Sequence, residues 1–142
     1  MTRAIDIVVA MRGEDVPQLV AAFSPDFYVD GDDARNAVRS ERLFNLMQYG
    51  SGIKVDLIVR KSSEYRALEF SRRRRVTMGA IETCIVSCED LILSKLAWAR
   101  DSASELQRRD VGQLLKGSAD LDYLHRWAAA LGVESLLEEM RG

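Results

Sequence analysis

The feature that most constrains the fold of this chain is a change of pattern near Ser87. Before this residue, segments that alternate apolar and polar residues, as strands do, are interspersed with segments of helical periodicity. After it, only helical periodicity remains. This order predicts an α+β protein with a mixed β-sheet, flanking helices and a C-terminal helical bundle. We expect an α/β core over residues 1–87 and a helical subdomain over residues 88–142, packed as one compact unit.

The individual segments can be placed within these two parts. Strands are predicted over residues 4–11, 26–30, 43–49, 53–60 and 76–86, and helices over residues 14–23, 32–42 and 64–74. The turn Gly50-Ser51-Gly52 predicts a hairpin between two of these strands, and Gly79 interrupts the last strand region. The helical part is predicted to contain helices that begin at Ser87 or Cys88, at Ser104 and at Asp120, and a short fourth helix over residues 133–140.

Charge and cysteine content exclude several classes of function. The formal net charge is −2, so no overall positive field favours nucleic acid or acidic lipid, and nothing indicates DNA specificity. No apolar run has transmembrane length and the start of the chain does not resemble a signal peptide, so we expect a cytoplasmic protein without membrane contact. Cys84 and Cys88 lack a surrounding set of His or acidic ligands, which favours reduced packing residues over a disulfide or a zinc site.

Two aspartates lie within predicted strands. Asp6 and Asp56 are each surrounded by β-branched and aliphatic residues. Aspartate is depleted in strands and is costly to bury without a partner. Two such residues in a small domain predict a carboxylate site on the sheet, for example a site for a divalent metal. The alternative is that one aspartate is solvated at a strand end and the other forms a salt bridge.

Side-chain alternation predicts where these carboxylates point. On the first strand, the more hydrophobic face is expected to pack on the main core and consists of Ile5, Ile7, Val9 and Met11. Asp6 then lies on the other face, together with Ala4. On the later strand, Asp56 shares a face with Lys54 and Ile58. If the two strands are neighbours, the carboxylates converge as an oxygen-liganded divalent cation requires.

A second pair of charges lies within the apolar stripes of two consecutive predicted helices. Lys95 falls in the middle of the stripe of its helix, and Asp110 lies between Leu106 and Leu114 on the next helix. A Lys95–Asp110 ion pair that fixes how the helices dock is one interpretation. The other is that Lys95 points towards the carboxylate site, where it contacts a phosphate.

Four segments carry a resemblance to a known family. They are TRAIDIVV (residues 2–9), KVDLI (54–58), VSCEDLILSKL (86–96) and RDV (109–111). In this order and spacing the chain resembles the minimal nucleotidyltransferase-superfamily proteins related to the AbiEii-type toxins of toxin–antitoxin systems. The resemblance extends from Thr2 to about Leu131 and implies a nucleotidyltransferase-like mixed sheet followed by a helical bundle.

The resemblance also implies a function. In active members, carboxylates on two neighbouring strands hold Mg²⁺ or Mn²⁺, which positions a nucleoside triphosphate for transfer of a nucleotide to a hydroxyl of RNA or protein. Asp6 matches the second acid of the Asp-x-Asp pair and Asp56 matches the third acid. Lys95 and Asp110 match the charged positions of the helical part. The implied catalytic residues are therefore Asp6, Asp56 and Lys95, with Lys95 and Arg3 as phosphate contacts.

Two departures from the family pattern favour a different function. Ala4 stands where the first acid of the pair is found in the family, and an alanine supplies no metal ligand. Family members also carry a glycine turn before this strand, whereas Met1 stands directly before it here, so either the phosphate site is lost or the true start lies upstream. We therefore expect weak Mg²⁺ or Mn²⁺ binding. The alternative function is a catalytically reduced domain that binds a protein or RNA partner in a toxin–antitoxin or defence setting.

A cluster of basic residues lies outside these motifs. Residues 54–75 carry eight basic and three acidic side chains, and the cluster ends with four consecutive arginines at positions 72–75. Contact with RNA or with nucleotide phosphate is one interpretation. A solvated helix end, balanced by acidic surface elsewhere, is the favoured alternative because the chain as a whole is acidic.

Overall fold

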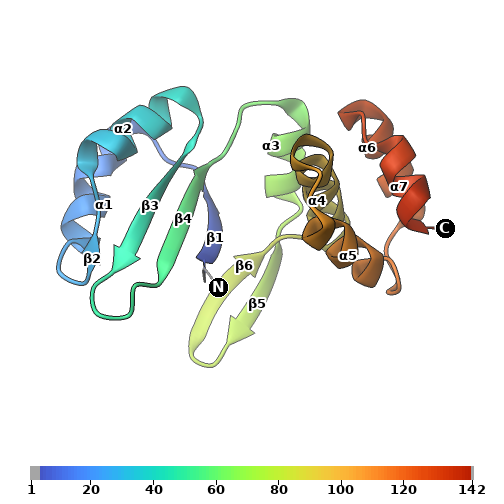
Figure 1. Cartoon of the computed structure of the whole chain (residues 1–142). Coiled ribbons are helices and arrows are strands. Elements are labelled where there is room, and N and C mark those ends of the chain that lie inside the picture. Colours follow the sequence, from blue (N-terminus) through green and yellow to red (C-terminus); the bar gives the residue numbers. More distant parts are fainter. Residues whose placement is uncertain (1–3, 142) are drawn as a thin grey trace. The chain divides into compact units, whose positions relative to one another are not determined.

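The chain forms two compact units, which we call the sheet unit (Met1–Ala67) and the helical unit (Leu68–Gly142). The computed structural model describes residues 4–141, and these contain both strands and helices, so the predicted α+β class is confirmed (Figure 1). The units divide earlier in the chain than the boundary expected near Ser87. The reason is that the hairpin before Ser87 forms a separate two-stranded sheet and belongs with the helices that follow it.

The sheet unit is built on a four-stranded mixed sheet. Its strands are β1 (Ala4–Val9), β2 (Phe27–Tyr28), β3 (Leu43–Gln48) and β4 (Lys54–Val59). They lie in the order β1-β4-β3-β2, in which β1 is parallel to β4 and the other neighbours are antiparallel. The 3-10 helix η1 (Gly13–Asp15), α1 (Val16–Phe23) and α2 (Gly31–Ser40) connect the strands, and α3 (Glu64–Ser71) follows the sheet. The edge strand β1 therefore joins the sheet through β4.

The turn between β3 and β4 explains why these strands pair as predicted. Gly50 and Gly52 adopt φ angles of 87° and 70°. Residues other than glycine rarely adopt this left-handed backbone conformation. The chain can thus reverse within a few residues, which allows β3 and β4 to form an antiparallel hairpin.

Helices α1 and α2 supply the residues that cover one face of the sheet. The buried cluster consists of Val16, Ala34, Ala37, Phe44, Leu46, Leu57 and Val59. Val9 and Met11 pack against this cluster as predicted, but Ile5 and Ile7 are exposed, so the expectation that all four residues pack on the main core is wrong. The reason is that β1 is an edge strand, and only its C-terminal end reaches the packed helices.

The helical unit combines a hairpin with four helices. Its elements are β5 (Arg74–Met78), β6 (Ile81–Ile85), α4 (Cys88–Ser102), α5 (Glu105–Leu114), α6 (Leu121–Leu131) and α7 (Glu134–Arg141). The side chains of Ser87, Ser104 and Asp120 accept hydrogen bonds from backbone amides at the starts of α4, α5 and α6, which confirms the predicted helix starts. The strand region interrupted near Gly79 is the β5–β6 hairpin.

The core of the helical unit lies among α4 to α7. Its fully buried side chains are Ile92, Leu93, Leu96, Val111, Leu124, Val133 and Leu137. The hairpin contributes little to this core, because only Val76 of its two strands is even partly buried. Among the helices of the described residues, none is long and apolar enough to cross a membrane.

Candidate functional site

The two strand aspartates lie opposite one another on adjacent strands. Asp6 of β1 is the register partner of Asp56 of β4 in the parallel pair. Directly paired residues of parallel strands project from the same face of the sheet, and neighbouring strands lie about 4.8 Å apart. The prediction that these strands are neighbours and that their aspartates share a face is confirmed. The face that carries them is the one opposite the α1 and α2 core.

Asp56 is also held by neighbours on its own face. Asn45 is its partner on β3, and the Asn45 amide Nδ2 donates a 2.5 Å hydrogen bond to Asp56 Oδ1. Lys54 Nζ lies 3.8 Å from the same oxygen, so the salt bridge anticipated by the alternative interpretation is present. Asp56 retains 19% side-chain exposure, whereas Asp6 is exposed. Three oxygen-bearing side chains, Asp6, Asp56 and Asn45, thus form a row across β1, β4 and β3.

The row suits a cation that receives its remaining ligands from a substrate. Mg²⁺ accepts oxygen ligands and is commonly held by one or two carboxylates together with substrate phosphates. Within residues 4–141, no group of three or more His, Cys, Asp or Glu side chains is arranged to hold a metal. Asp6 and Asp56 provide two carboxylates, the number that such a cation commonly takes from protein when substrate phosphates supply further ligands.

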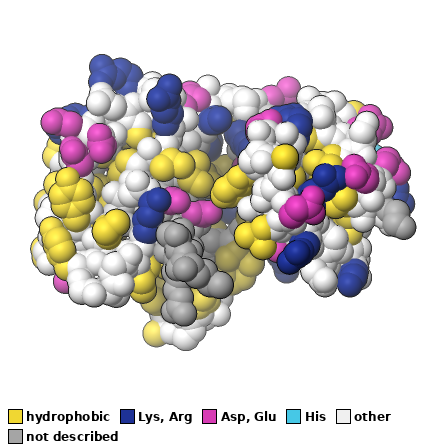
Figure 2. All heavy atoms as spheres, in the orientation of Figure 1, with side chains coloured by type: hydrophobic (Ala, Val, Ile, Leu, Met, Phe, Trp, Pro, Cys, Tyr) yellow, Lys and Arg dark blue, Asp and Glu magenta, His cyan; other side chains and the backbone are white. Residues whose placement is uncertain are grey.

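The sheet face around the carboxylates is apolar and open. Exposed side chains on this face are Val8, Tyr28, Leu43 and Met47. Figure 2 shows hydrophobic side chains beside acidic and basic ones over the strands of the sheet unit. An open apolar rim leaves room for a ligand at the carboxylates, and it also leaves the carboxylates in contact with water.

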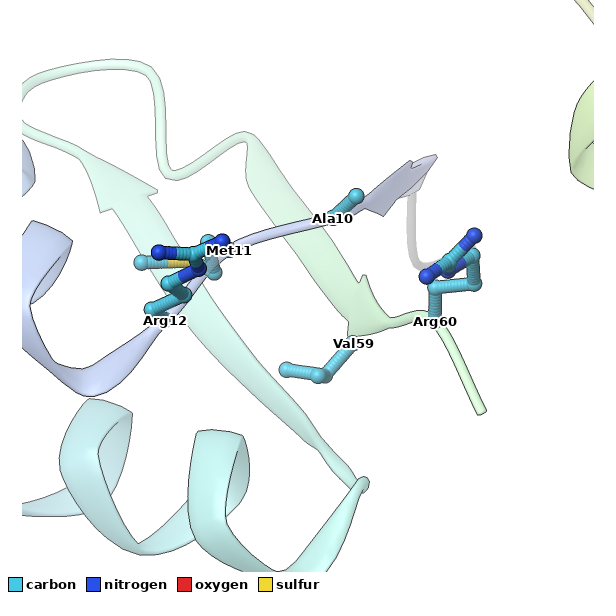
Figure 3. Close-up of a pocket in the computed structure, with 5 residues that line it drawn as sticks. All are labelled: Ala10, Met11, Arg12, Val59 and Arg60. Carbon is cyan, nitrogen blue, oxygen red and sulfur yellow. The ribbon is translucent and has the colours of Figure 1, made fainter. Parts of the chain in front are cut away.

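A shallow depression lies where β1 and β4 end. It is lined by Ala10, Met11, Arg12, Val59 and Arg60 (Figure 3). The Arg60 amide donates a hydrogen bond to the Val9 carbonyl at 2.9 Å. In this view the Arg12 and Arg60 side chains lie on opposite sides of Val59. Arg12 pairs with Glu14 at 3.4 Å. Neither aspartate of the pair lines this depression, so it is separate from the carboxylate row.

The predicted ion pair of the helical unit is present. Lys95 Nζ donates to Asp110 Oδ2 at 2.8 Å and to Gln107 Oε1 at 3.1 Å, which ties α4 to α5. The side chain of Lys95 is 22% exposed and that of Asp110 is 42% exposed, so the pair is less buried than its position in the apolar stripes suggested. These contacts favour the interpretation in which Lys95 fixes helix docking.

The helical unit contains a buried polar network that the sequence patterns did not predict. Asp90 is fully buried, and its Oδ2 accepts from Ser87 Oγ at 2.7 Å and from Arg72 Nε at 3.2 Å. Its Oδ1 accepts from the Tyr123 hydroxyl at 2.7 Å. Both carboxylate oxygens are therefore satisfied by partners from the N-cap of α4, from α6 and from the segment before β5.

Arg72 belongs to this network and differs in role from the rest of the arginine cluster. Its guanidinium lies 3.8 Å from the ring centre of Tyr123 and bonds Glu89 at 3.1 Å. Burial is the largest single influence and works to lower the pKa of Arg72, but the hydrogen bond to Asp90 and the nearby Tyr123, Asp90 and Glu89 together outweigh it, so the pKa is raised. Burial, and then the hydrogen bond to Asp90, raise the pKa of the Tyr123 phenol well above its ordinary value. Arg72 is thus a structural residue, whereas Arg74 and Arg75 are exposed on β5.

One sequence signal for this network exists. Ser87 and Asp90 have the Ser-x-x-acid spacing of a helix-capping box, and Ser87 Oγ also accepts from the Asp90 amide. That spacing predicts a local cap but not the long-range partners Arg72 and Tyr123.

The remaining proposed phosphate contact, Arg3, lies outside the described residues. Comparison with models of protein families finds no match to this chain, and comparison with curated proteins finds no relative.

Proposed function

We propose that this protein is a nucleotidyltransferase-like protein in which Asp6 and Asp56 hold one Mg²⁺ or Mn²⁺ together with a nucleoside triphosphate. The observation that carries the proposal is the direct pairing of Asp6 with Asp56 on one face of parallel strands. The resemblance of the segments around both residues to the nucleotidyltransferase superfamily supports the same assignment and would make the mixed sheet a nucleotidyltransferase-like core.

The proposal gives each residue of the row a role. Asp56 and Asp6 supply carboxylate oxygens, and Asn45 orients Asp56 through its amide hydrogen bond. A divalent cation bound there would offset the negative charge of the phosphates during attack by a hydroxyl of RNA or protein. Lys95 is placed outside the catalytic set, because its amine already bonds Asp110 and Gln107.

A second function is favoured by a specific observation. Ala4 occupies the position of the first acid, and Asp56 is already paired with Lys54. A catalytically reduced domain would need neither a third acid nor a bound metal. In that case the open sheet face would bind a protein or RNA partner in a toxin–antitoxin or defence setting.

Metal and nucleotide binding separate the two functions. In ¹⁵N correlation spectra of the full chain, paramagnetic Mn²⁺ is expected to broaden the amide signals of β1 and β4, and ATP is expected to increase that effect. Asp56→Asn should abolish it, whereas Asp122→Asn, an exposed change on α6, should not. Absence of localised broadening with and without ATP would contradict the metal proposal.

Catalysis needs its own test. Incubation of the protein with α-labelled nucleoside triphosphates, Mn²⁺ and either cellular RNA or protein should label one class of acceptor, and Asp6→Asn should remove the label. Ala4→Asp restores the Asp-x-Asp spacing and is expected to raise labelling. If wild type and Ala4→Asp both bind the metal but neither labels an acceptor, the result would favour the catalytically reduced domain.

A further inference from the structure

We propose that Lys54 is a built-in counter-ion of the carboxylate pair, and that a divalent cation binds only by displacing its ammonium group. The identity of the pair as a metal site rests on the proposed function, whereas the counter-ion role of Lys54 does not. Lys54 would then be the residue that sets the metal affinity of the site.

The backbone places Lys54 beside the pair. Lys54 and Asp56 are two residues apart on β4, so their side chains project from the same face of the sheet. The Lys54 Nζ to Asp56 Oδ1 distance of 3.8 Å is within ion-pair range but longer than a strong hydrogen bond. The ammonium is therefore attracted to the carboxylate without being locked to it, and a competing cation can replace it.

The strand register adds a second reason. Ala4 is the partner of Lys54, and Asp6 is the partner of Asp56, so the four residues form one block on two parallel strands. This block has two acids and one base. Alanine at position 4 supplies neither a negative charge to offset the lysine nor a metal ligand. With alanine there, the positive charge of Lys54 acts against a divalent cation held by the two aspartates.

The partners of Asp56 support the same inference. Asn45 Nδ2 and Lys54 Nζ both address Oδ1 of Asp56. The hydrogen bond from Asn45 and the ammonium charge of Lys54 thus act on the same carboxylate oxygen, on which a metal ion would also act. One oxygen of Asp56 is thus already engaged in the metal-free form, in keeping with a weakly binding site.

Metal titration of the full chain tests the inference. Lys54→Met keeps the length of the side chain and removes its charge, so Mn²⁺ affinity measured by paramagnetic broadening should rise about tenfold, the effect of removing one charge about 5 Å from a divalent ion in water. Lys54→Arg, which keeps the charge, should stay close to wild type. Lys61→Met is the matched control, because it removes a lysine charge from the same unit away from the pair.

A second measurement needs no metal. Hydrogen exchange of the β1 and β4 amides should accelerate in Lys54→Met, and this change should disappear in the Asp56→Asn background, because the counter-ion then has no carboxylate to neutralise. Equal effects in both backgrounds would overturn the counter-ion role. The counter-ion role would also be overturned if the Mn²⁺ affinities of wild type and Lys54→Met are measurable and identical.

The two proposals fail in different ways. If the exchange coupling between Lys54 and Asp56 is present but no variant binds Mn²⁺, the counter-ion role stands and the metal-dependent function is overturned. If Mn²⁺ binds equally well to wild type and Lys54→Met, the metal site stands and the Lys54 inference is overturned.

Discussion

Two aspartates of this chain, Asp90 and Asp56, lie in contrasting surroundings. Asp90 in the helical unit is fully buried, and both of its oxygens accept hydrogen bonds from Ser87, Arg72 and Tyr123. Asp56 in the sheet unit remains partly exposed, and both of its identified partners address a single oxygen. A carboxylate that is saturated by internal donors holds a fold together. A carboxylate that is only partly satisfied retains the capacity to bind a ligand.

This difference predicts that stability and binding depend on different aspartates. The chain allows the two units to be followed separately, because its tryptophans, Trp98 and Trp127, both lie in the helical unit. Tryptophan fluorescence therefore reports unfolding of that unit, and hydrogen exchange of β1 and β4 reports the sheet unit.

The largest effect is expected for Asp90→Ala. The change leaves the Tyr123 hydroxyl without its acceptor and removes one of the two carboxylates that pair with Arg72, so the free energy of unfolding should fall by about 3 kcal/mol. The loss is measured by urea unfolding, with tryptophan fluorescence as the readout. The control is Asp122→Ala on the exposed face of α6, for which we expect a loss below about 1 kcal/mol. Similar losses in both variants would remove the contrast between the two kinds of aspartate.

A smaller effect is expected for Tyr123→Phe. The ring can still stack on Arg72, but Asp90 Oδ1 loses its hydroxyl donor, which should cost about 1–2 kcal/mol at neutral pH. The same urea titration, read by tryptophan fluorescence, applies. A neutral result would show that another donor replaces the hydroxyl.

Tyr123 also predicts a pH dependence. Its pKa is raised in the folded protein, so the stability it contributes is fully present below the unfolded value of about 10 and is lost as the pH rises towards the folded value. Wild type should therefore lose stability above about pH 10 more steeply than Tyr123→Phe. Parallel pH profiles in the two proteins would contradict this cause.

The Lys95–Asp110 pair should contribute less than the Asp90 network. Because both side chains are partly exposed, solvent screens the pair, and Lys95→Met should cost about 1 kcal/mol. A double-mutant cycle with Asp110→Asn should show a coupling of about 0.5–1 kcal/mol. Lys116→Met, a change of an exposed lysine, is the control. A coupling near 3 kcal/mol would contradict this expectation, because it would show that the Lys95–Asp110 pair stabilises the fold as strongly as the buried Asp90 network.

The smallest effect on stability is expected for Asp6→Asn. Asp6 is exposed, so solvent screens its charge, and loss of that charge should change the free energy of unfolding by less than about 0.5 kcal/mol. Hydrogen exchange of the β1 and β4 amides should be close to wild type, while Mn²⁺ broadening should disappear. A large loss of protection would make Asp6 a structural residue like Asp90.

The sequence predicted the features that depend on local periodicity. Alternation in β1 and β4 predicted both strands and the shared face of Asp6 and Asp56, because the side-chain period of a strand is fixed. Helical periodicity likewise predicted the Lys95–Asp110 contact, because consecutive helices pack along their apolar stripes.

Other features depend on information that periodicity does not carry. Alternation assigned Ile5 and Ile7 to the core face correctly, but it could not reveal that the helices leave this end of an edge strand uncovered. The partners of Asp90 come from residues far away in the chain, so its local context showed only a helix cap. Alternation places Lys54 on the same face as Asp56, but the pairing of Lys54 with Ala4 follows only from the strand register.

The position of β1 at the edge of the sheet also has a consequence for the order of folding. Strands β2, β3 and β4 are joined by local connections, whereas β1 reaches β4 only after α1, β2, α2 and β3 have been traversed. Closing so long a loop costs more chain entropy than forming a hairpin, so we expect β1 to dock last. Pulsed hydrogen exchange during refolding should show late protection of the β1 amides. Asp6 and Asp56 would then meet only in the final step, and partly folded chains would be unable to bind a cation at this pair.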